Sequence, residues 1–188
     1  MRYRLAVFSL FAMLLALRLL AAPVPAPSGI LDVGPPPKGW TAEQYINEQI
    51  KFKSSPQILN KVCSDPEVKK LPLVATVKDA RPWMEQNVCV TPEEGRRRLR
   101  ITFRAGKRPE QVAIINAFLR VNLSEIKDTI KSDEADLHRC ENLISKLESR
   151  DTTQSFREFI HGLRSNRIPQ LRAEIARLKQ YTVIKWAK

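Results

Sequence analysis

The sequence predicts an α+β fold, in which a small antiparallel sheet packed with helices is followed by a long helix and a helical C-terminal hairpin. Three observations predict this fold. Residues 99–103 alternate apolar and polar side chains, as a half-buried strand does. From Pro109 the apolar residues recur every three or four positions, which is typical of an amphipathic helix. The last third of the chain repeats this helical period in several stripes.

The predicted strand turns directly into the predicted long helix. Its alternation puts Leu99, Ile101 and Phe103 on one face. Pro109 suits the first turn of a helix, because its ring fixes φ and its missing N–H has no partner to lose there. We expect the apolar face of the strand to pack on the helix that follows, against the stripe of Val112, Ile115 and Leu119.

The segment upstream of this strand predicts short helices and one further strand. Thr41 with Gln44 three residues later is a capping box, and Ser55 before Pro56 predicts the start of a second helix. Asp65-Pro66 starts another turn, and Asp79 is expected to cap a short helix that carries Trp83 and Met84. Residues 87–91 are predicted to form a strand that pairs with the Leu99 strand through the turn at 92–95.

Four segments follow from these patterns. Residues 1–24 are an N-terminal signal-anchor or signal peptide, and residues 25–39 are a proline-rich linker. Within residues 23–39, six prolines and three glycines leave room for one short strand around Leu31, which we expect at a sheet edge. Residues 40–110 form the α/β base domain. Residues 111–182 form the long helix and its helical extension.

The N-terminal segment predicts export. Arg2 and Arg4 precede an uncharged run from Leu5 to Leu17, and apolar character resumes after Arg18 up to Val24. Thirteen residues suit a signal peptide, whereas the whole run could span a bilayer if Arg18 reached outward. Because Leu20 and Pro23 make a poor cleavage site, we favour an uncleaved anchor with the arginine end inside.

The net charge of +12 favours an anionic partner, such as anionic lipid, acidic polysaccharide or nucleic acid. Export removes most of the case for nucleic acid. The densest positive run is a candidate patch for an anionic partner; a solvated strand face with a charged edge is the alternative interpretation. The patch consists of Arg96, Arg97, Arg98, Arg100, Arg104, Lys107 and Arg108.

The sequence contains no motif that predicts catalysis, a cofactor or a metal site. A phosphate-binding loop, an HExxH motif and a Ser/His/Asp order are all missing. Cys63, Cys89 and Cys140 are widely spaced, so a Cys63–Cys89 disulfide and three small buried hydrophobic side chains without a disulfide are both open alternatives. We expect a protein without enzymatic activity.

The C-terminal third predicts helices that pack on one another. Its apolar stripes cover about two heptads each, which is short for a self-standing coiled coil and favours a helical hairpin or a partner-dependent bundle. We expect Asn166 to cap the last helix. We also expect the surface from Leu137 to Leu147 to hold neighbouring helices together in an oligomer.

An ordered set of short motifs over residues 41–150 resembles the polysaccharide chain-length determinants, the Wzz-type polysaccharide co-polymerases. The motifs are Lys53-Ser54-Ser55-Pro56, Trp83-Met84-x-x-Asn87-Val88-x-Val90, Leu99-x-Ile101-x-Phe103 and Pro109-Glu110-x-x-Ala113-x-Ile115-Asn116. The resemblance implies an N-terminal membrane span, an α/β base beside the membrane and a long helix that projects from it. It also implies ring-like homo-oligomers that govern polymer length without catalysing a reaction.

The chain departs from that family in three ways. Residues 182–188 are too short and too charged for the family's second span, no kinase phosphate loop is present, and the proline-rich linker takes the place of the usual first strand. The resemblance implies a single-pass protein of the inner (cytoplasmic) membrane, with its bulk on the periplasmic side. Its expected partners are the membrane, further copies of itself, polysaccharide polymerase or export machinery, and acidic polysaccharide. The alternative is an exported helical scaffold that binds another envelope component.

Overall fold

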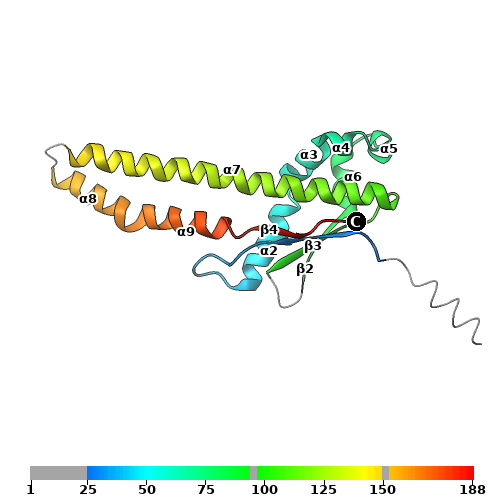
Figure 1. Ribbon diagram of the computed structural model, residues 1–188, viewed down its shortest axis with the longest axis horizontal. Helices are drawn as coiled ribbons and strands as arrows, with labels where there is room; N and C mark the ends of the chain where they lie inside the picture. The colour runs from blue at the N-terminus through cyan, green and yellow to red at the C-terminus, as the bar shows by residue number, and fades with distance from the viewer. Residues whose placement is uncertain (1–24, 94–96, 150–152) are drawn as a thin grey trace, which may run out of the picture.

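The computed structural model describes residues 25–93, 97–149 and 153–188, and it has the predicted α+β architecture (Figure 1). A four-stranded antiparallel sheet is packed with helices, and a long helix leads from the sheet into a C-terminal helical hairpin. The elements are β1 (Ser28–Asp32), α2 (Ala42–Lys53), α3 (Pro56–Ser64), α4 (Pro66–Lys69), α5 (Pro72–Ala75), α6 (Ala80–Asn87), β2 (Val88–Pro92), β3 (Arg98–Phe103), α7 (Arg108–Glu148), α8 (Gln154–Gly162), the π-helical turn η1 (Leu163–Arg167), α9 (Ile168–Leu178) and β4 (Thr182–Lys185).

The sheet has the strand order β2-β3-β1-β4, and this order corrects the prediction of an edge strand in a proline-rich linker. β1 is central, because it pairs with β3 on one side and with β4 on the other. The three prolines at 35–37 follow the last ladder residue, Asp32, so they remove no hydrogen-bond donor from the sheet. A strand therefore follows residues 1–24 directly, and β4 adds a strand that the sequence did not predict.

The inner face of the sheet carries the predicted core. Leu99, Ile101 and Phe103 are buried, as expected from their alternation, and they belong to one apolar cluster with residues of α3, α6 and α7. At Gly29 of β1 the helix α7 approaches the sheet closely: a Cβ atom there would lie 2.6 Å from Leu119 Cδ1. A glycine at this position lets the long helix lie directly on the sheet.

Helix α7 has 41 residues and is therefore about 60 Å long. Its first part covers the sheet. Its second part projects beyond the sheet and is accompanied by α8 and α9, which return antiparallel to it (Figure 1). The molecule is thus an α/β base with a helical arm.

The arm is held together by the apolar stripe of α7 that includes Leu137, Cys140, Ile144 and Leu147. This stripe packs on Ile160, Leu163 and Ile168 of the same chain. Ion pairs flank it: Arg164–Glu148 at 2.7 Å, Arg172–Glu141 at 2.9 Å and Lys179–Glu134 at 2.9 Å. The surface that we expected to join separate subunits is therefore used inside one chain.

Two local expectations have different outcomes. The capping box at Thr41 is present, with Gln44 N–H donating to Thr41 Oγ1 at 3.2 Å and Thr41 N–H donating to Gln44 Oε1 at 3.1 Å. Asn166 does not cap α9, because it lies inside the π-helical turn and the helical backbone runs through it into α9.

Cys63, Cys89 and Cys140 are free thiols and half-buried.

Within the described ranges, none of the helices is both long and apolar enough to cross a bilayer. The predicted anchor, residues 1–24, lies outside these ranges.

Candidate functional site

The candidate basic patch does not form one surface, because β3 separates its members. Arg97 and Arg98 lie at the start of this strand and Arg104 follows its end, so they are about 20 Å apart. Arg96 lies outside the described residues. The sequence run therefore divides into two groups at opposite ends of the sheet.

The first group is largely neutralised by neighbouring acids on the outer face of the sheet. Arg98 Nε lies 3.9 Å from Asp32 Oδ2, and Arg100 Nη2 donates to Glu93 Oε1 at 2.5 Å. Arg100 also donates to Ser28 Oγ at 3.2 Å. These contacts agree with the alternative interpretation of a solvated strand face for this half of the run.

The second group lies where the two ends of the described chain meet. The Arg108 guanidinium donates to the main-chain oxygen of Pro25 at 3.0 Å and to that of Lys188 at 3.0 Å. Asn116 of α7 also holds Ala187, accepting from its N–H at 2.9 Å and donating to its carbonyl at 3.4 Å. Pro25 and Lys188, 163 positions apart in the chain, are therefore fixed on the same end of the base.

Three sequence segments contribute to this end: residues 25–29, 104–109 and 186–188. They contain no acidic side chain. Glu110 follows directly, and its carboxylate accepts backbone N–H groups of Lys107 at 2.8 Å and Leu73 at 3.3 Å. We call this surface the basic end; its cations are Arg104, Lys107, Arg108 and Lys188.

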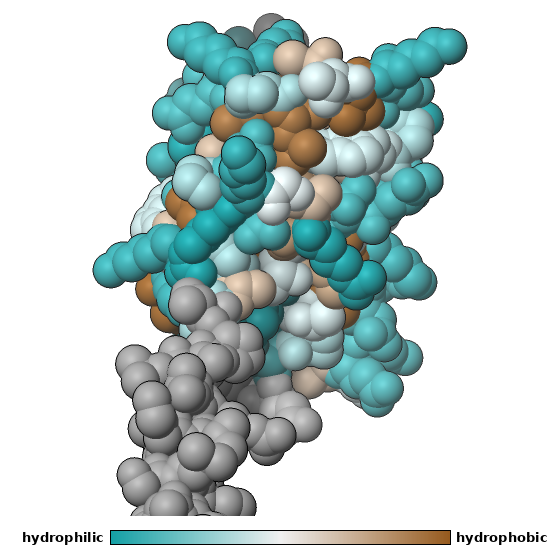
Figure 2. All heavy atoms as spheres, turned by 90° about the vertical axis from the view of Figure 1, so that its right-hand side faces the viewer, coloured by the Kyte–Doolittle hydropathy of each residue, from teal (hydrophilic) through white to brown (hydrophobic). Residues whose placement is uncertain are grey.

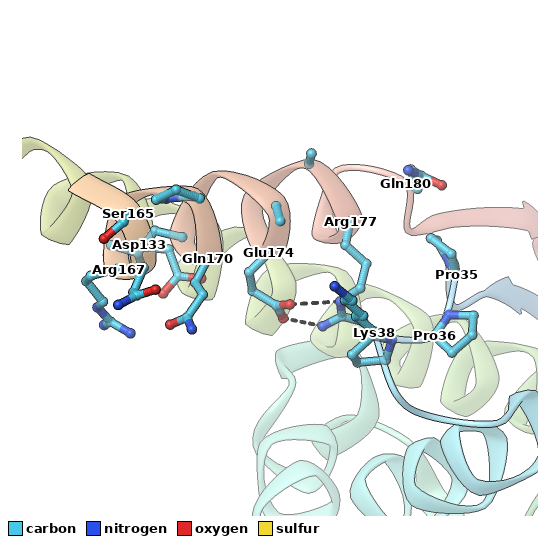
Figure 3. Close-up of a pocket in the computed structure, with 16 residues that line it drawn as sticks. Pro35, Pro36, Lys38, Asp133, Ser165, Arg167, Gln170, Glu174, Arg177 and Gln180 are labelled. Atoms are coloured by element: carbon cyan, nitrogen blue, oxygen red, sulfur yellow. Dashed lines mark hydrogen bonds and ion pairs between the residues drawn. The ribbon is translucent and has the colours of Figure 1, made fainter. Parts of the chain in front are cut away.

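A second candidate site is a groove of about 840 Å³, with both apolar and charged lining residues, between the 35–38 loop and α9 (Figure 3). Figure 3 shows Lys38 beside the Glu174–Arg177 ion pair, with Gln170, Arg167 and Asp133 further along the groove. The sequence did not predict this groove, because its residues come from three segments that only the fold brings together. The remaining lining residues are Pro35, Pro36, Pro37, Ser165, Asn166, Pro169, Leu171, Ala173, Ala176 and Gln180.

The groove offers charges and hydrogen-bonding groups of both signs. Burial, assisted by the nearby Glu174 and Asp136 carboxylates, raises the pKa of Asp133 above its ordinary value, while Arg167 acts in the opposite direction. A groove of this kind can hold a polar chain by hydrogen bonds. Within the described residues, no group of three His, Cys, Asp or Glu side chains is arranged to hold a metal ion.

A cluster of polar side chains joins the arm to the base, and two of its members, Glu174 and Arg177, also line the groove. Arg177 of α9 donates to Tyr45 Oη at 2.6 Å, and Tyr45 donates to the carbonyl of Val33 at 2.7 Å. Tyr181 bonds Tyr45 through its hydroxyl, and Glu174 pairs with Arg177. Burial, followed by the Tyr181 hydroxyl, raises the pKa of Tyr45 above its ordinary value. The cluster therefore ties α9 and Tyr181 to α2 and to the segment that follows β1.

Lys53 lies in the same region and is buried, with 2% of its surface exposed. Its ammonium group lies 5.0 Å from the centre of the Phe52 ring and 5.4 Å from that of Tyr181. Burial lowers the pKa of Lys53 to about 8, although Glu125 acts in the opposite direction. At a given pH, a larger fraction of the Lys53 side chain is therefore in the neutral amine form than in an exposed lysine.

No family model, no curated protein and no solved structure matches the chain.

Proposed function

We propose that this protein is a membrane-anchored, non-catalytic regulator of polysaccharide chain length or export that acts through oligomeric assembly. The proposal combines the resemblance to the chain-length determinants with the architecture of the described residues. It assigns the protein to the inner membrane, with residues 40–188 on the periplasmic side. The polymer would be a lipopolysaccharide or an exopolysaccharide.

The observation that carries the proposal is that the molecule has two different ends. Pro25 and Lys188 are held on one end of the base by Arg108, while the arm leaves the base on the other side (Figure 1). A chain anchored through residues 5–24 would then present its base to the membrane and its arm to the space beyond. The resemblance implies this arrangement.

The position of β1 adds support. The proline-rich linker was a departure from the family pattern, and β1 removes that departure, since a strand begins three residues after Pro25 and lies at the centre of the sheet. The sheet therefore starts immediately after the predicted anchor, and a base beside the membrane needs such a short connection.

Assembly requires a surface other than the stripe from Leu137 to Leu147, because that stripe is buried within the arm. Helix α8 offers one: Phe156 is 47% exposed and Phe159 is 49% exposed, on a helix whose Ile160 is buried against α7. Two exposed aromatic rings three residues apart lie on one helix face. We assign the subunit contact to this face.

Two measurements test the proposed function. The full chain in mild detergent should have the mass of a homo-oligomer, and a strain that lacks the protein should lose the preferred length of its surface polysaccharide while it still makes polymer. A strictly monomeric protein whose deletion leaves polymer length unchanged would eliminate the proposal and favour the scaffold alternative.

A further inference from the structure

The basic end carries an excess of positive charge that the fold itself does not explain. Four cations from two segments that are far apart in the sequence lie at this end, and the three segments that form it contribute no acidic side chain. Mutual repulsion among these groups costs stability unless an anion lies opposite them. Lys107 and Arg108 stand at the N-terminus of α7, where the helix dipole favours anions and disfavours cations.

An exposed tryptophan accompanies these cations. Trp186 lies between Lys185 and Lys188 and is 42% exposed, although the next residue, Ala187, is buried. Tryptophan with flanking lysines is typical of the membrane–water interface, where the ring lies at headgroup depth and the ammonium groups meet phosphates. Figure 2 looks onto this side of the molecule and shows hydrophilic side chains that project around smaller apolar areas.

The position of the basic end agrees with this composition. The apolar run of residues 5–24 ends one residue before Pro25, and Arg108 holds Pro25 beside Lys188. If residues 5–24 span a bilayer, the basic end is the part of the base nearest to the headgroups. The groove beside α9 and the exposed face of α8 belong to the arm and its junction with the base, away from that end (Figure 1).

We propose that the basic end is a docking surface for anionic phospholipid headgroups, with Trp186 at the interface and Arg104, Lys107 and Lys188 facing lipid phosphates. This inference rests on the proposed membrane anchor. Contact with the leaflet would fix the tilt of the base and hence the direction of the arm. Arg108 contributes by holding the two chain segments together.

The test uses the full chain in lipid nanodiscs and the emission of one tryptophan at a time. Both reporter proteins carry Trp83→Phe; one also carries Trp40→Phe and keeps Trp186, and the other carries Trp186→Phe and keeps Trp40. Trp40 is 46% exposed and precedes α2, so it is a matched control at a different place on the base. A headgroup spin label on phosphatidylcholine quenches rings that lie at the interface.

We expect the spin label to quench Trp186 and not Trp40 in discs that contain phosphatidylglycerol. Arg104→Glu with Lys107→Glu should abolish this quenching, since each surface cation favours contact with an anionic leaflet by about fivefold. Salt of about 1 M should also abolish it, because the Debye length falls to about 3 Å. A glutamate at 107 suits the helix N-terminus, so the variant should fold. Lys131→Glu with Lys146→Glu, which makes the same charge change on the arm, should leave the quenching intact.

Four results would overturn the proposal. If Trp186 is quenched in neutral discs, and in the charge-reversed variant, as strongly as in the wild type in anionic discs, the contact is apolar and does not recognise headgroups. Inserted protein with unquenched Trp186 would refute the docking surface and leave the proposed function standing. A chain that does not enter the disc at all would refute both. If only soluble polygalacturonate, and no lipid, changes Trp186 emission through Arg104 and Lys107, the basic end is a polymer site instead.

Discussion

Replacing Phe103 by alanine tests the core of the base. The side chain is 2% exposed and lies on the inner face of β3, with its ring centre 5.3 Å from that of Trp83 at an interplanar angle of 66°. Truncating a buried phenylalanine removes its transfer free energy and leaves a cavity, which together cost about 3–5 kcal/mol. The lost edge-to-face contact, about 0.5–1.5 kcal/mol, is part of that sum.

Arg100→Ala is the matched control on the opposite face of the same strand. Its side chain is 44% exposed and paired with Glu93, and exposed pairs of this kind contribute about 0.2–1 kcal/mol. We therefore expect Phe103→Ala to lose at least three times as much unfolding free energy as Arg100→Ala.

The assay is urea denaturation of the full chain in mild detergent, followed by far-UV circular dichroism. The midpoint should fall with little change in slope, as expected when a mutation changes stability alone. Phe103→Leu, which keeps most of the volume, should lie between the two variants and covers the case in which the alanine variant does not fold. Equal losses for Phe103→Ala and Arg100→Ala would show that the assignment of the strand faces is wrong.

Three further predictions concern the junction, the pH dependence and the arm. Arg177→Met should cost about 1.5–3 kcal/mol, because it removes charge-assisted hydrogen bonds to Tyr45 and Glu174, and hydrogen exchange should then increase first around Tyr181. Lys53→Met should be more stable than the wild type at pH 7 by on the order of 3 kcal/mol, since the pKa of Lys53 is about 8 when folded and 10.5 when unfolded. Between these two pKa values the unfolded state binds more protons than the folded state, so the wild type gains stability as the pH rises from 8 to 10. The stability difference between Lys53→Met and the wild type should therefore narrow over this range, and a constant difference would contradict the assigned pKa. Phe159→Ser should weaken subunit association in analytical ultracentrifugation and change stability little, whereas Ile160→Ser should lower the melting temperature. The reverse pattern would show that the exposed and buried sides of α8 have been interchanged.

The sequence predicted the elements whose residues carry a local signal. The alternation at Leu99, Ile101 and Phe103 determined β3 and its buried face, and the Thr41 capping box determined the start of α2. These signals need only neighbouring residues, so they do not depend on the rest of the fold.

What the sequence did not predict depends on pairs of residues that are far apart in the chain. β1 is central because β4, about 150 residues later, pairs with it, and the four residues of β4 are too short to show a period. The stripe from Leu137 to Leu147 is a packing surface, as its period predicts, but it packs on α8, η1 and α9 of the same chain. The basic run is visible in the sequence, whereas its division by β3 and the position of Lys188 beside Arg108 depend on the fold.

The most direct test of the central claim is the length distribution of surface polysaccharide from the source strain after deletion of this gene, resolved on a gel. The proposed function predicts that polymer is still made but loses its preferred length, that the full chain restores this length, and that a chain with Phe156→Ser and Phe159→Ser does not. An unchanged distribution in the deletion strain would contradict the claim that this protein regulates polymer length.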